Sequence, residues 1–444
     1  MKRIKTIIGI LLIILTITSC NNSVTKNSDD PFVSWAMKNS YEIETLELGK
    51  QQSDLKSLKQ IIGKAEVVCL GESRHDIHEQ FQLKHRFIKY LVEEMGFTTF
   101  ILEASLPYSK LINEYILNSN GSIDEIMANM PGWFLWDTQE MLNIINWMRD
   151  FNKNPENVRK IQFYGIDVVA PNYALDQILD YLNKVDETIV EKYQNKSFAQ
   201  DIIDDNNWST SLQRYSELTA EEKQTLYNNY NELYEQIRQN ETKYISISSN
   251  DEYNWILRLA YCANDANKMF SAEKRIDIGL IRDNAMAQNA LWIKSNLSND
   301  AKIIIWAHNV HIAKAEFTMT GEPESIKGMG YILGQELENN MISIGASFNQ
   351  GEFQNWNKSF PPAKQITLDG TLAKLKMKHF LLDLKGKTDD KNVINWLNTD
   401  KIIRGQGFEM TCIPAKSFDA IYFVDKITRT IPNQKSSERF RNSN

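Results

Sequence analysis

Glu66-Val-Val-Cys-Leu-Gly-Glu-Ser-Arg-His75 is the stretch that decides the fold of this chain. Its apolar part stops at a glycine, which is typical of a short strand buried on both faces of a parallel sheet. Three later runs have the same form, an apolar strand that leads into an acid or a histidine: Phe100-Ile-Leu-Glu103, Ile161-Gln-Phe-Tyr-Gly-Ile-Asp167 and Lys302-Ile-Ile-Ile-Trp-Ala-His308. Because ligands bind beyond the carboxyl ends of parallel strands, these runs predict a shared site of carboxylates and imidazoles.

Helical and extended patterns alternate around these runs. In the first part, the patterns predict helices over 78–95, 111–117 and 137–151 and strands over 66–70, 98–102 and 160–164. Later they predict helices over 174–185, 219–239, 251–269 and 283–297, then strands over 302–306, 341–348, 379–383, 409–413 and 419–424. The expected fold is therefore α/β, with a mostly parallel or mixed central sheet flanked by helices and a helical insertion subdomain.

The chain starts with a targeting segment. Lys2, Arg3 and Lys5 precede an uncharged run that is too short to span a bilayer, and small residues then lead to Cys20. This order resembles a bacterial lipobox, which implies cleavage after Ser19 and acylation of Cys20. We expect a lipid-anchored protein of the bacterial cell envelope, facing the periplasm or the cell surface.

The predicted organisation has six parts. They are a lipoprotein signal peptide (1–19), a polar tether (20–31), the first part of the α/β core (32–173), a helical subdomain (174–297), the second part of the core (298–430) and a loose tail (431–444). The net charge is −7 and no basic run occurs, so nucleic acid is excluded as a partner. The sequence does not indicate an oligomeric state.

Three cysteines remain after Cys20, an odd number without close spacing. Cys69 falls inside a predicted strand, where cysteine behaves as a small hydrophobic residue. The spacing contains no zinc-binding pair and no disulfide framework, although a single Cys262–Cys412 bridge stays open.

Glu72 and His75 are the strongest candidates for catalysis. A histidine has a pKa near neutral pH and can act as a general base, and a carboxylate three residues away can fix its tautomer. His308 and His311 form the second candidate pair. Imidazoles at that position could stabilise an oxyanion, protonate a leaving alkoxide or bind a metal.

Supporting residues are expected around these two pairs. Glu103 would be buried and needs a cation, for which the candidates are Lys84, Arg74 and Arg86. For Asp167, helix capping competes with a functional role. Trp133, Phe134 and Trp136 could line an apolar cleft, although packing in the core is an equal alternative.

Missing motifs narrow the reaction class. The sequence has no G-x-S-x-G nucleophile elbow, no dinucleotide or Walker glycine loop and no H-E-x-x-H zinc helix. Hydrolysis by an activated water molecule, with or without a metal, is the chemistry that remains.

Several segments of the chain together resemble a known family, the erythromycin esterases. The matching segments are Leu70-Gly-Glu-Ser-Arg-His75, Leu83-Lys-His-Arg86, Leu102-Glu-Ala104, Pro131-Gly-Trp133, Trp136, Asn146-Trp-Met-Arg149, Tyr164-Gly-Ile-Asp167, Arg282-Asp-Asn284, Trp306-Ala-His-Asn-Val-His311, Gly328-Met-Gly330 and Phe418-Asp-Ala420. The resemblance spans about residues 66 to 424, and the combination of segments is specific although no single one is.

The resemblance implies a carboxylic ester hydrolase that opens the lactone ring of macrolide antibiotics and so inactivates them. Glu72 and His75 would activate the water, while Glu103, His308 and His311 would complete the pocket. It implies no metal and no other cofactor, and a small-molecule ester as the partner. Many members carry arginine where this chain has Lys84, so we expect a looser pairing of that position with Glu79 or Glu103. Arg74 places charge beside the base and could change substrate choice.

Two alternatives stay open. A divalent metal held by Glu72, His75, His308 or His311 would make the chain a metal-dependent hydrolase of another envelope substrate. A non-enzymatic surface lipoprotein that binds glycans or partners would need none of these residues.

Overall fold

A computed structural model describes residues 30–50, 52–130, 135–298, 300–353 and 358–433. Its centre is a nine-stranded sheet. Across the sheet lie β1 (Ser40–Glu42), β10 (His379–Asp383), β13 (Ala420–Ile427), β8 (Met341–Phe353), β2 (Val67–Leu70), β5 (Ile303–Trp306), β3 (Thr99–Ser105) and β4 (Gln162–Asp167), with β9 (Lys358–Phe360) paired to β8. The strands from β13 to β4 are parallel, whereas β1, β10 and β9 pair antiparallel. The predicted α/β class is confirmed.

The register brings the ends of four strands to one level. Leu70 lies opposite Trp306, Trp306 opposite Leu102, and Leu102 opposite Gly165. The acids and histidines that follow these residues therefore emerge side by side at one edge of the sheet, as the four apolar runs predict. The strand-to-helix turns at this edge are built from residues far apart in the chain.

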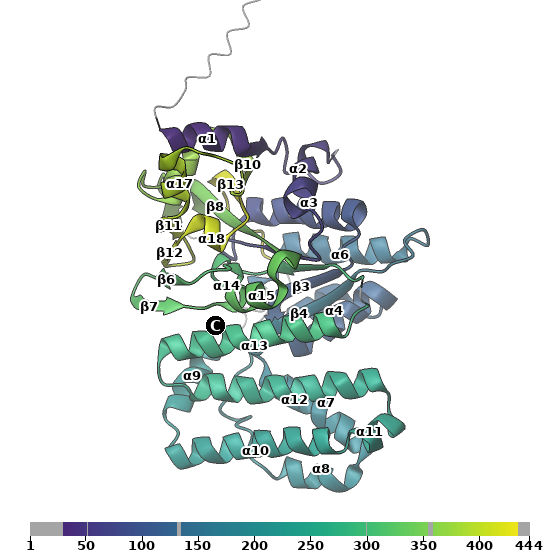
Figure 1. Cartoon of the computed structure of the whole chain (residues 1–444). Helices are drawn as coiled ribbons and strands as arrows, with labels where there is room; N and C mark the ends of the chain where they lie inside the picture. Colours follow the sequence, from purple (N-terminus) through teal and green to yellow (C-terminus); the bar gives the residue numbers. More distant parts are fainter. Residues whose placement is uncertain (1–29, 51, 131–134, 299, 354–357, 434–444) are drawn as a thin grey trace, which may run out of the picture.

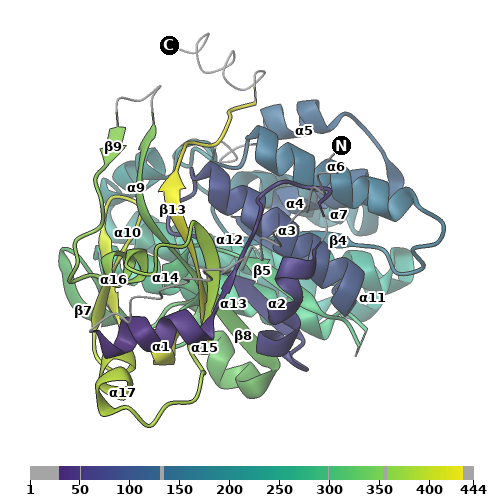
Figure 2. The same cartoon turned by 90° about the horizontal axis from the view of Figure 1, so that it is seen from above.

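Successive residues of the buried strands face opposite sides, which gives the sheet two separate cores. Val67 and Cys69 pack with Met286 of α13, whereas Val68 and Leu70 pack with α3 and α6. Helices of the first part are α3 (His78–Met95), α4 (Leu106–Asn118), α5 (Ile123–Asn129) and α6 (Gln139–Lys153). Figure 2 shows α3 and α6 from above, on their side of the sheet.

The region from α7 to α13 is helical, and within it α7, α8 and α10 to α12 share a separate core rich in leucines and tyrosines. Its elements are α7 (Pro171–Val185), α8 (Glu187–Gln194), α9 (Trp208–Ser216), α10 (Ala220–Gln239), α11 (Glu241–Ile247), α12 (Asn250–Ser271) and α13 (Arg275–Ser295). In Figure 1, α13, α12 and α10 lie in successive layers on one side of the sheet, with α13 nearest to it. The long helices start and end within a few residues of the predicted ranges, except that α13 begins earlier than expected.

A second, four-stranded antiparallel sheet lies beside the main one, in the order β11 (Lys401–Arg404), β12 (Glu409–Cys412), β6 (Phe317–Met319) and β7 (Glu322–Ile326). Its β6, β7 and β11 were not predicted, because short strands with mixed side chains have no clear periodicity. The shorter helices are α1 (Pro31–Asn39), α2 (Lys56–Ile62), α14 (Asn309–Ile312), α15 (Met329–Leu337), α16 (Leu368–Ala373), α17 (Lys391–Leu397) and α18 (Pro414–Ser417).

Two further expectations can be compared with the structure. Cys262 and Cys412 are both free and buried, so the possible bridge is not formed. The predicted loose tail begins with ordered residues, since Ile431 and Asn433 form backbone hydrogen bonds with Gln139 and Asp137. Among the helices that the structure describes, none has the length and apolar character needed to cross a bilayer. The signal peptide, with Cys20, lies outside the described residues.

Candidate active site

A cavity of about 330 Å³ opens at the carboxyl ends of β2, β5, β3 and β4. Six residues singled out in the sequence line it: His75, Glu103, Trp136, Asp167, His308 and His311. The helical region contributes Trp208 and Arg282, and the turn between β11 and β12 contributes Gln406. Segments more than two hundred residues apart thus converge on one cavity, as the strand ends predict.

Glu72 lies fully buried behind His75 and orients its ring. Its Oε1 lies 2.5 Å from Nδ1 of His75, and its Oε2 accepts hydrogen bonds from Nζ of Lys84 and Nε1 of Trp306. The glycine at the strand end allows this close packing, since a Cβ at Gly71 would lie 2.3 Å from Oδ1 of Asn309. Lys84 therefore pairs with Glu72, and the expected pairing with Glu79 or Glu103 is wrong.

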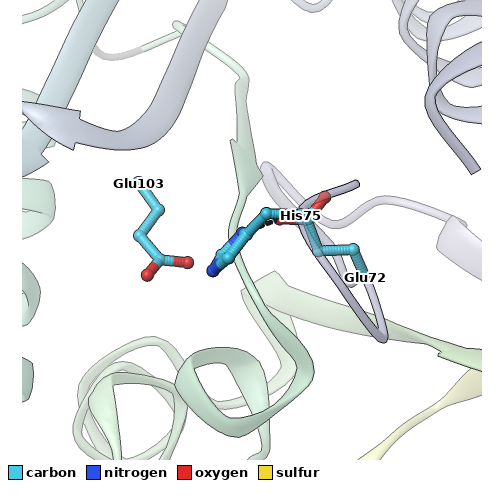
Figure 3. Close-up of side chains that lie close together, drawn as sticks. All are labelled: Glu72, His75 and Glu103. Carbon is cyan, nitrogen blue, oxygen red and sulfur yellow. Dashed lines mark hydrogen bonds and ion pairs between the residues drawn. The ribbon is translucent and has the colours of Figure 1, made fainter. Parts of the chain in front are cut away.

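The ring of His75 lies between two carboxylates, Glu72 and Glu103 (Figure 3). Its Nε2 has no hydrogen-bond partner among the described residues and is directed toward Glu103 and the cavity. Burial works to lower the pKa of His75, but the Glu72 carboxylate outweighs it and raises this pKa above its ordinary value. Burial also works to raise the pKa of Glu72, yet Lys84 and His75 hold it below the usual value. This is the arrangement of a base with a carboxylate orienter.

Glu103 is buried and paired with cations from the second half of the chain. Its Oε1 lies 2.9 Å from Nη2 of Arg282 and 3.1 Å from Nε2 of His311, and its Oε2 accepts from the backbone N–H of His308. The three sequence candidates were wrong because each pairs with another acid: Lys84 with Glu72, Arg74 with Asp76 and Arg86 with Asp54. Although burial opposes ionisation, His311 above all holds the pKa of Glu103 well below its usual range.

His311 is held as a cation by two carboxylates. Its Nδ1 lies 2.6 Å from Oδ1 of Asp283, while its Nε2 faces Glu103. Burial alone would lower the pKa of His311, but Asp283 and Glu103 raise it to about 10. Both ring nitrogens face acidic oxygens, so this imidazolium contributes fixed positive charge to the cavity wall.

His308 has the opposite protonation state. Burial, assisted by the charge of His75, lowers its pKa to about 3, so the ring is neutral. Its Nε2 donates to the backbone oxygen of Ser73, and its Nδ1 accepts from the N–H of Val310. Both nitrogens are used in bonds to the backbone, which favours a role in holding the Glu72–His75 loop over direct proton transfer to a substrate.

The remaining predicted residues differ in their surroundings. Asp167 receives three hydrogen bonds from Arg282 and so supports the Glu103 cluster. Trp136 lies edge-on to His75, with ring centroids 5.3 Å apart, and is buried in the core as well as lining the cavity. Arg74 forms a two-point ion pair with Asp76 and does not line the cavity. Trp133 and Phe134 lie outside the described residues.

Four residues of the site were missed in the sequence reasoning. Arg282 and Asp283 stand together in a segment recognised as a family match, and the paired charges inside an apolar helix were a usable signal. Gln406 stands between two glycines, a pattern typical of a tight turn. Trp208 had no signal, because an exposed tryptophan at the start of a helix looks like any surface residue.

A metal ion is a candidate because one ligand atom each from Glu72, His75 and Glu103 lies within 4.8 Å of the others. However, both oxygens of each carboxylate already face N–H donors or cations. A divalent cation would have to displace Lys84 or Arg282, or share their oxygens against charge repulsion. The donor set therefore fits a metal poorly.

Comparison with known proteins gives the family. The sequence model described as erythromycin esterase matches residues 92–427, most of the chain. The chain belongs to the erythromycin esterase family. The erythromycin esterase type II of Escherichia coli is 27% identical over 318 aligned residues, which cover 67% of this chain and 72% of that protein. Membership of the erythromycin esterase family supports an esterase or hydrolase activity.

Solved structures of similar chains show the same fold. A crystal structure of a Bacillus cereus protein superposes with a TM-score of 0.76 at 24% identity, covering 91% of this chain and 98% of that one. A mutant of the erythromycin esterase EreC, in its open conformation, gives a TM-score of 0.71 at 18% identity and covers 88% and 98% of the two chains. The mixed sheet flanked by helices is thus a fold that this chain shares with EreC.

Proposed function

We propose that this chain hydrolyses a carboxylic ester with an activated water molecule, and that the substrate is the lactone ring of a macrolide. The observation that carries the proposal is the Glu72–His75 pair, in which Nδ1 is fixed by the carboxylate and Nε2 is open to the cavity. A nucleophilic serine or cysteine is not required, because the base can act on water directly.

The proposed reaction starts with neutral His75. Its Nε2 takes a proton from a water molecule, whose oxygen bonds to the ester carbonyl carbon while the π electron pair moves to the carbonyl oxygen. When the C=O bond re-forms, the bond between the carbon and the alcohol oxygen breaks. The His75 imidazolium returns its proton to the departing alkoxide, and the acid and alcohol leave.

We assign this returned proton to His75 and an electrostatic role to His311. Both ring nitrogens of His311 face carboxylates, so its N–H groups are not available to a leaving alkoxide. The positive charge of His311 and Arg282 instead balances Glu103, which would otherwise repel the developing negative charge.

A macrolide is the proposed substrate because of the cavity wall and the E. coli relative. The cavity volume of about 330 Å³ is at the lower end for ligand pockets, so it accommodates the reacting ester while the rest of a macrocycle projects from its mouth. Trp208 lines the cavity and is 41% exposed, which offers an apolar surface for that part. The relative named erythromycin esterase type II supports this substrate class.

The test is to incubate the soluble fragment of residues 29–444 with 14- and 16-membered macrolides and to follow the products by mass spectrometry. We expect the addition of one water by the wild-type chain and none above background by His75→Ala. If the macrolides remain unchanged while simple esters are hydrolysed, the chain is an esterase that acts on another substrate. Unchanged turnover by His75→Ala would reject the proposed base.

Metal-dependent hydrolysis is the second candidate, favoured by the 4.8 Å grouping of Glu72, His75 and Glu103. It predicts a stoichiometric metal by elemental analysis and loss of activity after chelation that the metal restores. Our proposal predicts that chelation leaves kcat unchanged.

The membrane anchor is a separate proposal. We infer from the lipobox-like segment that Cys20 is acylated and holds the protein to the bacterial envelope. Labelling with a fatty acid in a bacterial host should mark the wild-type chain and not Cys20→Ser, and labelling of both would reject the site.

A further inference from the structure

The turn between β11 and β12 reaches the loop that carries the proposed base. The side-chain Oε1 of Gln406 accepts a hydrogen bond of 2.7 Å from the backbone N–H of His75, across 331 residues of sequence. Gln406 also lines the cavity together with His75. The second sheet is thereby connected directly to the catalytic loop.

This hydrogen bond fixes which way the amide of Gln406 points. A backbone N–H can be accepted only by the amide oxygen, so the amide nitrogen must occupy the other position. The structure records no partner for Nε2 of Gln406 within the described part of the chain. A side chain whose acceptor is used and whose donor is unused, in a cavity wall, presents an N–H to whatever occupies the cavity.

The ring nitrogens of the two other histidines in the cavity are already used. His308 donates Nε2–H to Ser73, and both nitrogens of His311 face carboxylates. Arg282 directs Nε and Nη2 to Asp167 and Glu103, whereas its Nη1 lies 3.2 Å from Nε2 of the His311 cation, which cannot accept a hydrogen bond. Of the donors in this group, Gln406 is the one that is bonded to the base residue itself.

The turn that carries Gln406 is held in place on both sides. Gly407 has φ of +81°, a conformation that favours glycine, and the N–H of Gly405 donates to the oxygen of Phe408. Phe408 packs against the ring of His308, with centroids 5.4 Å apart. At the base of the turn, Arg404 donates to the backbone oxygens of Asn349 and Pro361. A donor on such a support needs little reorganisation when charge develops.

We propose that Nε2 of Gln406 donates a hydrogen bond to the carbonyl oxygen of the substrate as that oxygen becomes negatively charged. This inference rests on the proposed ester hydrolysis, and it adds a catalytic residue to it. When hydroxide oxygen bonds to the carbonyl carbon, the π pair moves to the carbonyl oxygen, and the Gln406 N–H stabilises that oxyanion. The N–H proton stays on Gln406 throughout, and the bond weakens again when the C=O bond re-forms.

Two substitutions separate this role from a purely structural one. Gln406→Glu keeps an oxygen that accepts from the His75 N–H but removes the donor, whereas Gln406→Met removes both. Gln365→Glu makes the same chemical change at an exposed position that does not line the cavity, and serves as the control. The probe is p-nitrophenyl butyrate, whose leaving group needs no proton. kcat is read on the pH-independent plateau, because an added carboxylate would raise the pKa of His75.

If Gln406 is the oxyanion donor, both Gln406→Glu and Gln406→Met should lose about 10²–10³-fold in kcat with little change in KM. Both variants should also bind a phosphonate monoester, which imitates the tetrahedral intermediate, more weakly by a similar factor, while Gln365→Glu matches the wild type. Circular dichroism melting curves confirm folding, and the phosphonate affinity is measured on the folded variants.

Other outcomes overturn the inference. If Gln406→Glu keeps wild-type kcat and phosphonate affinity while Gln406→Met loses them, Gln406 only positions His75 and the oxyanion role is wrong. The role is equally wrong if both variants remain active. If the wild-type chain hydrolyses no ester at all, the proposed function fails, and the inference fails with it. Turnover by the wild type therefore separates the two failures.

Discussion

His75 and His311 are both imidazoles that touch a carboxylate at a strand end, yet the structure gives them different chemistry. His75 is hydrogen-bonded to one carboxylate, Glu72, and its other nitrogen faces the cavity and Glu103 without a hydrogen bond among the described residues (Figure 3). His311 has a carboxylate at each nitrogen, Asp283 and Glu103. The pKa of both rings is raised, but His311 reaches about 10 and stays charged, whereas His75 retains a nitrogen that can exchange a proton.

The difference teaches that the number of carboxylates paired directly with the ring nitrogens decides what a buried histidine does. One carboxylate orients the ring and stabilises the imidazolium that forms during the reaction. Two carboxylates convert the ring into a permanent cation, and none, as for His308, leaves it neutral with a pKa of about 3. The following substitutions test this comparison, from the largest expected effect to the smallest.

Removing the open nitrogen of His75 should have the largest effect. In His75→Asn the water loses its base, so kcat should fall by about 10²–10⁴-fold. The measurement is turnover of p-nitrophenyl butyrate with KM determined in parallel. His78→Asn is the control, since His78 lies three residues away and pairs with Glu140 outside the cavity. Equal losses in both variants would show that the effect comes from the loop and not from the base.

Breaking the ion pair between His311 and Asp283 should lower the stability of the fold. Asp283→Asn removes one partner of a buried ion pair, and we expect the free energy of unfolding to fall by about 3–5 kcal/mol at neutral pH. Urea denaturation measures this. Asp389→Asn, at an exposed position, should stay within about 0.5 kcal/mol of the wild type.

The His311–Asp283 ion pair also predicts that the stability of the fold depends on pH. Because the pKa of His311 is raised in the folded state, its contribution is fully present below the ordinary value near 6.5 and is lost as pH rises toward about 10. Wild-type stability should therefore decline over this window, and the decline should be smaller in Asp283→Asn. The same slope in both proteins would contradict the assignment.

The site residues that stand at or just after the end of a buried strand could be predicted from the sequence, and the others could not. Glu72, His75, Glu103 and His308 directly follow or end apolar runs, and parallel strands bring such positions together. The partner of Glu103 could not be read in the same way. Arg282 comes from a helix of the insertion, 179 residues further along the chain, and no periodicity specifies which face of a helix meets a strand end.

The fold shows the same limit. Long helices and buried strands have regular apolar spacing and were predicted close to their final positions. The β11–β12 turn was missed because β11 was not predicted: it is a short strand at the edge of the second sheet, where it pairs with β12. Gln406, which depends on that turn, was therefore missing from the predicted site.

Removing the charge of Glu72 should shift the activity profile. Because Glu72 raises the pKa of His75, Glu72→Gln should move the acidic limb of the kcat/KM profile to lower pH. Wild-type activity should rise as pH passes through the raised pKa of His75. If the acidic limb of the profile stays in place in Glu72→Gln, a group other than His75 is titrating. Because the substitution leaves Lys84 without its partner, circular dichroism checks that the variant is folded.

Trp208 should give the smallest effect. Its exposed ring lines the cavity, 5.9 Å from the Arg282 guanidinium, and has no contact with His75 or Glu72, so Trp208→Ala should raise KM for a macrolide by about tenfold or less and leave kcat unchanged. Tyr227→Ala, exposed on α10 away from this cavity, should leave both constants unchanged. A fall in kcat for Trp208→Ala would place this residue closer to the reacting atoms than its exposure indicates.

The contrast between the histidines can be measured directly by nuclear magnetic resonance on protein labelled with ¹⁵N in its six histidines, each assigned by a single substitution. Titration should find His311 protonated at both nitrogens through neutral and mildly alkaline pH, His308 neutral with its proton on Nε2, and His75 titrating above its ordinary pKa. If His75 and His311 instead titrate together near that ordinary value, the two-carboxylate cation and the one-carboxylate base are both contradicted.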